Sequence, residues 1–461
     1  MPDRRRDRWS PHQGRGWWAR VSESIESRLW PLPLLTVFVA VGLGIVLPRV
    51  DLAVDASLPT AVHSAVFNGG AATARSVLSS IAGSLITATS LTFSLTVIAL
   101  QLASSQASPR VLRLFARDRN VHVTLAAFLG TFAYSLTVLR SVRSGDDGAS
   151  EFVPRIAVTV AFAMTVLSVI LLVFFLAHLA TQLRVETMLK EIHAETDRTI
   201  DLVGERNASA PEYRGEITEP LWRGVVVSES SGFITRLDVP ALVASADDHD
   251  IVVEVDRDVG DNVVTGTPLA HWWPRRTDAG TSTGPIAAEV ASAVKNAFSI
   301  RYERTAAEDI DFGVQQTVDI GLRALSPGVN DPTTAAHALG HLSAITARRL
   351  HNPTLPARLA GLHGQLSVVT SPSPRTDAIE AALTPLRHYG ATHPAVVSRL
   401  LQAIAELHLL CADHDVEVAL LAQLDALAEQ LRSSTGDPVV VATQLVETSA
   451  LRTRIAGAPT Q

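Results

Sequence analysis

Between Ser76 and Pro109 the chain reads SVLSSIAGSLITATSLTFSLTVIALQLASSQASP, 34 residues without Asp, Glu, Lys or Arg. A helix of this length would measure about 51 Å, well beyond the roughly 30 Å of hydrocarbon in a bilayer. Core helices of soluble proteins seldom run uncharged for so long. The stretch therefore predicts a transmembrane helix, and it decides the class of the protein.

Three further uncharged stretches are long enough to cross a bilayer: Leu29–Pro48, Asn120–Leu139 and Ile156–Leu183. The first is too long for a signal peptide, and no small-residue cleavage site follows it, so we expect it to be retained. Four transmembrane helices are thus predicted within residues 31–183.

The distribution of arginine predicts the orientation of these helices, because loops rich in Arg stay on the cytoplasmic side. Arginines gather before the first span and between the second and third, whereas the other two loops mix Arg with acidic residues. They are Arg4, Arg5, Arg6, Arg8, Arg15, Arg20 and Arg28, then Arg110, Arg113, Arg117 and Arg119. We predict a multi-pass protein of the cell membrane with both termini in the cytoplasm.

Two segments are predicted to lie along the membrane surface. Before the first span, Trp17, Trp18, Val21, Ile25 and Leu29 recur at helical spacing, which is typical of an interfacial amphipathic helix. After the second span, the basic residues that follow its final proline predict an elbow where the helix leaves the bilayer.

The second span carries a ridge of small residues spaced four apart. They are Ser76, Ser80, Ser84, Ala88, Thr92 and Thr96. Such ridges let helix backbones approach closely. One interpretation is a packing helix at the centre of the bundle, with its hydroxyls bonded to its own carbonyls. The other is a pore-lining helix at the centre of a homo-oligomer. Because no span contains a charged residue, an ion-coupled pump is not expected.

Charge is divided unevenly along the chain. Residues 1–155 hold 16 Arg and 10 acidic residues, a net charge of +6. Because the net charge of the whole chain is −7, residues 156–461 carry a net charge of −13. An acidic C-terminal part makes nucleic acid an improbable partner, since phosphate binding needs clustered Lys and Arg. The lipid bilayer is the partner that the composition predicts.

Residues 217–274 change to a period of two and predict a small β-module. The expected strands are Val225–Val227, Gly232–Leu237, Ile251–Val255 and Val263–Trp272. The turn VGDNVVTGTPL (259–269) resembles the hairpin of the biotinyl/lipoyl-like barrel-sandwich family. Carriers of that family modify a lysine, and none lies between Lys190 and Lys295. We therefore expect a structural or small-ligand β-barrel or sandwich-like module, not a carrier.

The densest polar constellation follows in a part that reads as mostly helical. Its candidate ligand or subunit-contact residues are Arg301, Arg304, Asp309, Asp319, Asn330 and Asp331. A helix is predicted from Ala306 to Leu325, and Asp331 is predicted to cap the next helix with Pro332 at its first position. The Ser-Pro-Gly-Val-Asn-Asp-Pro loop is either a rigid connection or part of a site where these residues converge on an anion or a neighbouring chain.

The run RT…D…FG…DI…ALSPGVNDPTTA (304–335) resembles the signature of a bacterial predicted-membrane-protein family, domain of unknown function 2254. The layout of spans, β-module and helical part matches over nearly the whole chain. The resemblance implies architecture and a membrane location, and it supplies no catalytic residues.

Enzymatic motifs are absent from the sequence. There is no Ser-His-Asp order, P-loop or dinucleotide-binding glycine pattern, so neither an enzyme nor a cofactor is expected. His337 and His341 lie four apart but lack a clear third ligand, so no metal is predicted. Cys411 is the only cysteine, which excludes an intrachain disulfide.

The predicted fold is thus an α-helical membrane domain followed by an α+β region, a small β-module plus a helical C-terminal domain. The predicted boundaries are 1–30 (basic tail and amphipathic helix), 31–183 (membrane), 184–216 (helical stalk), 217–274 (β-module), 286–450 (helical domain) and 451–461 (loose tail). Two functions fit this organisation. One is an oligomeric channel-like protein with the second span at its centre; the alternative is a membrane-tethered sensor or scaffold.

Overall fold

The computed structural model describes residues 31–54, 66–106, 118–144, 151–182, 184–217, 222–275, 285–411 and 413–457. These fall into two compact units that divide between Met188 and Leu189. We call residues 31–188 the membrane unit and residues 189–457 the C-terminal unit. The predicted amphipathic helix before the first span and the elbow after the second lie outside the described residues.

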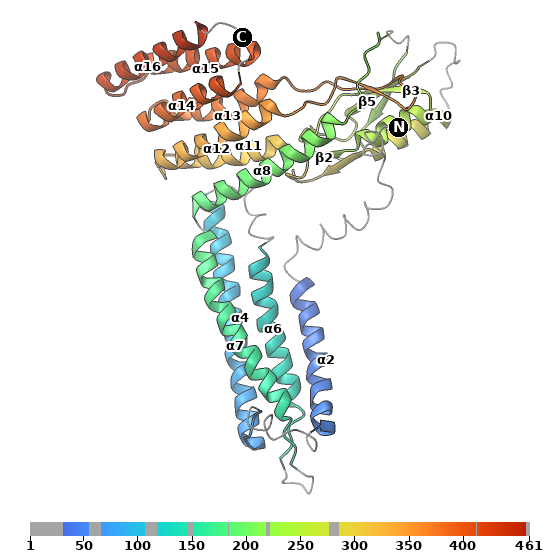
Figure 1. Ribbon diagram of the computed structural model, residues 1–461, viewed down its shortest axis with the longest axis vertical. Helices are drawn as coiled ribbons and strands as arrows, with labels where there is room; N and C mark the ends of the chain where they lie inside the picture. The colour runs from blue at the N-terminus through green and yellow to red at the C-terminus, as the bar shows by residue number, and fades with distance from the viewer. Residues whose placement is uncertain are drawn as a thin grey trace, which may run out of the picture. The chain divides into compact units, whose positions relative to one another are not determined.

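The membrane unit is a bundle of four helices (Figure 1). They are α2 (Pro31–Val54), α4 (Ala71–Gln106), α6 (Arg119–Leu139) and α7 (Arg155–Gln182). Each is long and apolar enough to cross a membrane. The prediction of four apolar spans is therefore confirmed.

Helix α6 forms the centre of this bundle. Its span is 61% buried, against 17% to 22% for the other three. Small residues allow α2 to approach it closely, because a Cβ on Gly44 would lie 2.8 Å from Thr137 and one on Gly130 would lie 2.9 Å from Thr36. Interpreting the second span as the central packing helix of the bundle is thus wrong for this chain, in which the third span holds that place.

Carboxylates from neighbouring segments cap two of these helices at their N-termini. Asp51, at the end of α2, accepts hydrogen bonds of 3.0 Å from the amides of Ile156 and Ala157 at the start of α7. Glu151 accepts a 2.8 Å bond from the amide of Ala71, which opens α4. A helix N-terminus stabilises negative charge, so these acids fix one end of the bundle.

Helix α8 (Val185–Ala208) starts three residues after α7 ends and enters the C-terminal unit. The sequence predicted a charged stalk here, but Leu189, Ile192 and Ile200 are at most 2% exposed. Ile200 belongs to the core of the helical part of the unit. The apolar face of α8 is therefore packed along its length, and the helix is an integral element of the unit.

Three of the four predicted strands are confirmed, whereas the predicted strand Val263–Trp272 is divided into β4 (Asn262–Val263) and β5 (Pro268–Pro274), which belong to different sheets. The predicted region also holds β1 (Gly224–Val227), β2 (Gly232–Leu237) and β3 (Ile251–Val255). Three strands, β6 (Phe298–Arg301), β7 (Arg358–Ala360) and β8 (Leu366–Val369), and the helix α9 (Val239–Asp248) were not predicted, whereas α10 (Pro285–Asn296) lies in the region predicted to be helical. Residues from the region assigned to the helical domain thus complete the sheets.

Two sheets are present among the described residues. One has five strands in the order β1-β5-β3-β8-β7, and the other has three in the order β4-β2-β6. Only β3 and β8 run parallel, with Val253 opposite Val368. Ile234, Val290 and Leu359 meet in one core with side chains of α9. We call β1–β8 with α9 and α10 the sheet module; it is a mixed helix and sheet structure.

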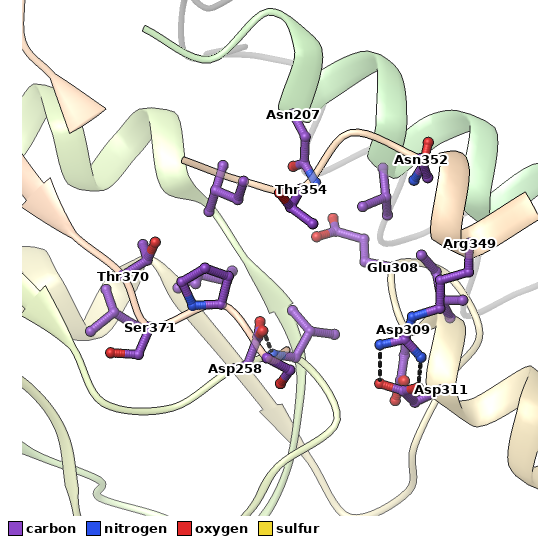
Figure 2. Close-up of a pocket in the computed structure, with 18 of the residues that line it drawn as sticks. Asn207, Asp258, Glu308, Asp309, Asp311, Arg349, Asn352, Thr354, Thr370 and Ser371 are labelled. Carbon is purple, nitrogen blue, oxygen red and sulfur yellow. Dashed lines mark hydrogen bonds and ion pairs between the residues drawn. The ribbon is translucent and has the colours of Figure 1, made fainter. Parts of the chain in front are cut away.

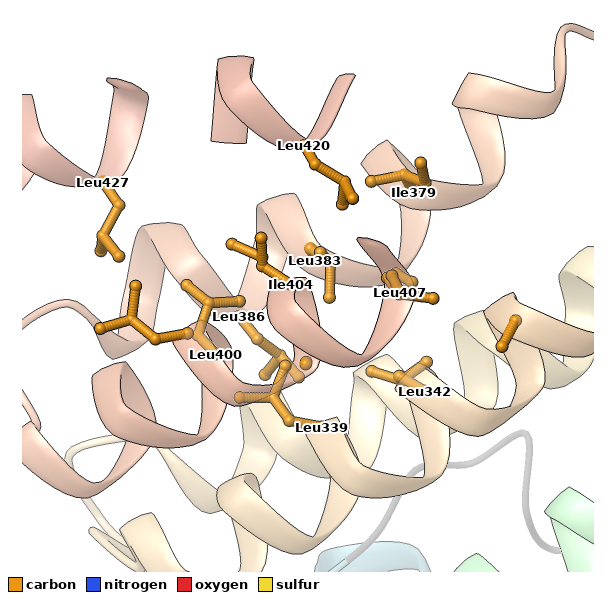
Figure 3. Close-up of a cluster of buried hydrophobic side chains, with 14 of the residues drawn as sticks. Leu339, Leu342, Ile379, Leu383, Leu386, Leu400, Ile404, Leu407, Leu420 and Leu427 are labelled. Carbon is orange, nitrogen blue, oxygen red and sulfur yellow. The ribbon is translucent and has the colours of Figure 1, made fainter. Parts of the chain in front are cut away.

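The helical part of the C-terminal unit comprises α11 (Ile310–Ala324), α12 (Pro332–His351), α13 (Arg375–Gly390), α14 (Pro394–Leu410), α15 (His414–Arg432) and α16 (Pro438–Ala456). Figure 3 shows their leucine-rich core, in which Leu339, Leu383 and Leu400 are at most 1% exposed. Leu451 and Ile455, one helical turn apart, belong to the same core. The prediction of a loose tail from residue 451 is therefore wrong up to residue 457, and residues 458–461 lie outside the described part.

Candidate functional site

A cavity of about 280 Å³ lies within the C-terminal unit (Figure 2). Its walls come from the end of α8, the turn between β3 and β4, the start of α11, the end of α12 and residues 370–375. The sheet module and the helical part thus both contribute to it. Its volume is near the lower end of the range for small-molecule sites.

The turn between β3 and β4 forms one wall of the cavity. A glycine in this turn allows its backbone to lie close to Arg304 and Asp309. Gly260 has a backbone φ of +98°, a conformation that residues with a Cβ rarely adopt. A Cβ there would lie 2.7 Å from Arg304 Nη2 and 2.8 Å from Asp309 Oδ2. The amide of Asp258 donates to Asp261 Oδ2 at 2.9 Å, which closes the turn.

Asp309 joins that wall to the helical part. It caps α11 by accepting a 2.9 Å hydrogen bond from the amide of Phe312. Arg304 donates to both of its oxygens, from Nε at 2.8 Å and Nη2 at 2.9 Å. Asp309 is only 4% exposed, and this burial raises the pKa of its carboxyl although Arg304 acts in the opposite direction. The pair is a buried structural contact at the edge of the pocket.

Two further ion pairs neutralise charges in the lining. Glu308 lies 2.7 Å from Arg206 Nη1 and 3.3 Å from Arg236 Nε. Arg349 donates to both oxygens of Asp311 (Figure 2). Burial lowers the pKa of Arg349, although a guanidinium keeps its charge at any physiological pH.

Other polar groups of the lining have unused bonding capacity. The Oδ1 atom of Asn207 and the Nε atoms of Arg206 and Arg257 are buried and have no hydrogen-bond partner among the described residues. A buried polar group without a partner costs about 1–3 kcal/mol. The pocket therefore has the chemistry to bind a polar ligand.

The structure separates the six candidate residues of the polar constellation. Arg304 and Asp309 lie at the start of α11, whereas Asn330 and Asp331 follow its end, about 22 Å away for a helix of 15 residues. Asp319 lies on α11 between them. The expected convergence of Arg304 with Asn330 and Asp331 within one chain is therefore wrong.

Arg301 ends β6 in an exposed position, paired in register with Phe233 of β2. Of the six, only Asp309 lines the pocket, and Arg304 is its ion-pair partner. A contact of the others with a ligand or a neighbouring chain stays a prediction.

The loop between α11 and α12 is a tight connection. Asn330 has a φ of +50°, and Asp331 accepts hydrogen bonds of 3.1 Å from the amides of Thr333 and Thr334. Pro332 occupies the first turn of α12. The predicted cap is thus confirmed, and the local hydrogen bonds favour the rigid-connection interpretation of this loop.

The four-residue ridge of α4 does not form one face. Ser76, Ser80 and Ser84 are exposed, whereas Thr92 and Thr96 are 0% and 8% exposed. Ala88, between them, is half-buried. Each four-residue step turns the helix by about 400°, so the ridge rotates about 200° over its length. A pore or a packing surface that uses all six positions together is therefore contradicted.

A different stripe of small residues is exposed on α4. Its members are spaced alternately four and three apart, which keeps them on one side of a helix. They are Ser76, Ser80, Gly83, Thr87, Ser90 and Ser94. Thr87 and Ser90 donate to carbonyls one turn earlier at 3.0 Å. A spacing of exactly four residues does not reveal this stripe, because its members alternate between steps of four and three.

His341 of α12 contacts a second histidine. His341 Nδ1 lies 2.7 Å from Nδ1 of His193 on α8, and the two rings meet edge to face. Within the described part of the chain, no group of three or more His, Cys, Asp or Glu side chains could hold a metal ion.

Comparison with known sequences assigns the chain. A family model described as "Predicted membrane protein (DUF2254)" matches residues 26–406. The chain belongs to this family. The match includes the four apolar helices and every segment that lines the pocket.

The chain is also similar to mycobacterial proteins. Uncharacterized proteins of Mycobacterium bovis and of two strains of Mycobacterium tuberculosis, CDC 1551 and H37Rv, are each 32% identical over 409 residues. The alignments cover 88% of this chain and 76% of each relative. No solved structure matches.

Proposed function

We propose that this family member is a membrane-anchored sensor whose C-terminal unit binds a small polar ligand in the pocket. The observation that carries the proposal is the set of buried polar atoms in the lining that lack partners in the described residues: Asn207 Oδ1, Arg206 Nε and Arg257 Nε. A ligand that hydrogen-bonds in the pocket would offset part of their desolvation. Such a site also fits the small-ligand interpretation of the β-module.

Helix α8 gives the pocket a connection to the membrane unit. Val203, Arg206 and Asn207 on its last turns line the cavity, and its first residue follows α7 by three positions. A ligand that contacts Asn207 would change the forces on a helix that follows the last span in the sequence. The proposal therefore includes a signal that passes along α8.

Ligand-dependent stabilisation of the full chain in detergent tests this function. A ligand at one hundred times its Kd should stabilise the folded state by about 2.7 kcal/mol, which shifts the melting temperature by several degrees. Ser371→Trp should abolish the shift, because Ser371 lines the pocket in an exposed position where a larger side chain is tolerated. Ser449→Trp, exposed on α16, is the matched control and should keep it. If no compound of a broad metabolite panel stabilises the protein, the sensor function is rejected.

A second candidate function is an oligomeric, channel-like protein, and the exposed stripe on α4 favours it. Lipid-facing positions elsewhere in the membrane unit are large and apolar, such as Phe38, Phe162 and Phe174. Small hydroxylated residues that face lipid contribute little stabilisation, whereas the same residues pack closely against a second helix. The proposed arrangement places α4 of each subunit at the centre of a homo-oligomer.

Cross-linking tests this arrangement, and removing Cys411 gives a cysteine-free background. Gly83→Cys, in the stripe, should form a disulfide-linked dimer in membranes. Phe93→Cys, exposed on another side of α4, should not. Equal cross-linking at both positions would reject the interface. Absence of current through bilayers that contain the protein would reject conduction.

The proposed orientation keeps both termini in the cytoplasm, on the basis of the arginine distribution. Reporter fusions at residue 461 and within residues 145–150 should respond oppositely. Equal responses at these two positions would overturn the orientation.

A further inference from the structure

We propose that the pocket ligand is a small organic cation that carries a primary ammonium group. The inference rests on the proposed sensor function and names the ligand class of the same site. Its basis is the balance of charges and hydrogen-bond acceptors in the lining.

Acidic side chains outnumber basic ones around the cavity, six to four. Three of the acids, Glu308, Asp309 and Asp311, pair with arginines, and Asp256 lies 2.8 Å from His271 Nδ1. In the described residues, the carboxylates of Asp258 and Asp261 have only backbone amides as partners. Asp258 Oδ1 accepts from the amide of Val259 at 2.7 Å, and Asp261 Oδ2 accepts from that of Asp258.

These two carboxylates lie in the same turn, and their charges act on each other. Arg206 and Arg349 attract Asp258 but are already paired with Glu308 and Asp311. Asp258 is itself exposed, and Asp261 is half-buried. A cation in the pocket would reduce the repulsion between Asp258 and Asp261, and an anion would increase it.

An independent acceptor comes from α8. Asn207 is 9% exposed; its Nδ2 donates to the carbonyl of Pro353 at 3.0 Å, while its Oδ1 has no partner among the described residues. Figure 2 shows Asn207 and Asp258 extending from different elements towards the same cavity. An ammonium group offers three donors and a positive charge, and so matches an amide oxygen together with a carboxylate, whereas the unpartnered Nε atoms of Arg206 and Arg257 need an acceptor on another part of the ligand.

The side chains around the cavity and its volume narrow the class of ligand further. The described part of the chain has no cluster of three or more metal-ligating side chains, which argues for an organic cation over a metal ion. A cavity of about 280 Å³ suits a molecule the size of a short diamine or a cationic amino acid.

Binding of three probes of equal length to the full chain in detergent tests the inference. The probes are 1,5-diaminopentane, glutarate and 1,5-pentanediol, measured by calorimetry at fixed pH and ionic strength. We expect only the diamine to bind. Asp258→Asn should weaken its binding at least tenfold, because the change removes the charge and preserves the shape. Asp248→Asn, exposed on α9 and outside the lining, should leave it unchanged.

The outcomes separate this inference from the proposed function. Binding of glutarate without the diamine would overturn the cation class and keep the sensor. Diamine binding that Asp258→Asn does not weaken would overturn the assigned site. Absence of binding by all three probes and by the metabolite panel would overturn both. The melting temperature of Asp258→Asn without ligand should be no lower than that of the wild type, which shows that the variant is folded.

Discussion

Gly260 lies directly against the carboxylate of Asp309, so close that a Cβ on the glycine would be 2.8 Å from Oδ2. The contact joins the β3–β4 turn to the N-cap of α11. Two motifs that stand apart in the sequence, the Val-Gly-Asp turn and the Arg-Thr…Asp…Phe-Gly run, thus meet at one edge of the pocket. The shape of the cavity depends on this contact.

Replacing Gly260 by Ala should therefore destabilise the C-terminal unit by about 2–4 kcal/mol. The change adds the strain of a positive φ to a clash with Asp309 and Arg304. Gly266→Ala is the matched control: its φ is +89°, but no atom lies within 4 Å of its Cβ position. Strain alone should lower its stability by about 1 kcal/mol. Thermal unfolding of the full chain in detergent measures both, and equal losses would show that the contact with Asp309 is unimportant.

The elements that could be predicted are those with a local signal. Four spans follow from long stretches without charge, and strands such as Ile251–Val255 follow from runs of β-branched residues. The cap at Asp331 follows from an Asp-Pro pair before an apolar run. In each case neighbouring residues contain the physical cause.

The elements that could not be predicted depend on partners that are distant in the sequence. Strand β8 pairs with β3 across 115 residues, from Val253 to Val368, and three or four residues are too few to show a period. The pocket was missed for the same reason, because Asn207, Asp258 and Ser371 come from three separate segments. No local pattern distinguishes Asn207 from any other polar residue at a helix end.

Asp309→Ala should destabilise the C-terminal unit by about 3–5 kcal/mol. It removes the cap of α11 and leaves Arg304, whose side chain is 18% exposed, without its carboxylate partner. Asp309→Asn should lower the stability by a smaller amount, because the side-chain amide oxygen can still accept a hydrogen bond from the backbone amide of Phe312. Glu429→Ala, which breaks an exposed pair with Arg432, should change stability by less than about 1 kcal/mol. Unfolding curves of the three variants compare these losses. A loss for Asp309→Ala no larger than that of Glu429→Ala would contradict the structural role.

Asp247 should stabilise the sheet module most strongly at neutral pH. Burial alone would raise the pKa of Asp247, but hydrogen bonds from Ser367, the amide of Leu362 and Arg275 together lower it below the usual value. A carboxyl with a lowered pKa stabilises the folded state above its unfolded pKa of about 3.9, and this stabilisation is lost as the pH falls further. The stability difference between wild type and Asp247→Asn should be large at pH 6 and should shrink towards pH 3.

Asp250→Asn is the control for this pH series. Its carboxylate is 60% exposed and lies 3.6 Å from the same arginine, Arg275. The exposed group should contribute less than about 1 kcal/mol at pH 6. A difference between wild type and Asp247→Asn that does not change with pH would show that the charge of Asp247 is not what stabilises the module.

Acidification should weaken the contact between α8 and α12 through His341. Burial, followed by the charges of His193 and His337, lowers the pKa of His341. The folded state therefore binds fewer protons than the unfolded state just below the unfolded pKa of about 6.5, so stability falls as the pH drops through that value. Two protonated rings could not keep Nδ1 atoms 2.7 Å apart, because both would carry hydrogen.

The melting temperature should therefore fall between pH 7.5 and pH 5.5, and His341→Gln should reduce this fall. Asp197 lies 3.6 Å from His193 and is paired with Arg348, so these two charges stay in place in the variant. The melting temperature of His363→Gln, a change at an exposed position, should fall as much as that of the wild type. A fall for His341→Gln equal to that of the wild type would mean that other groups cause the pH dependence, and that the contact between His193 and His341 is indifferent to protonation.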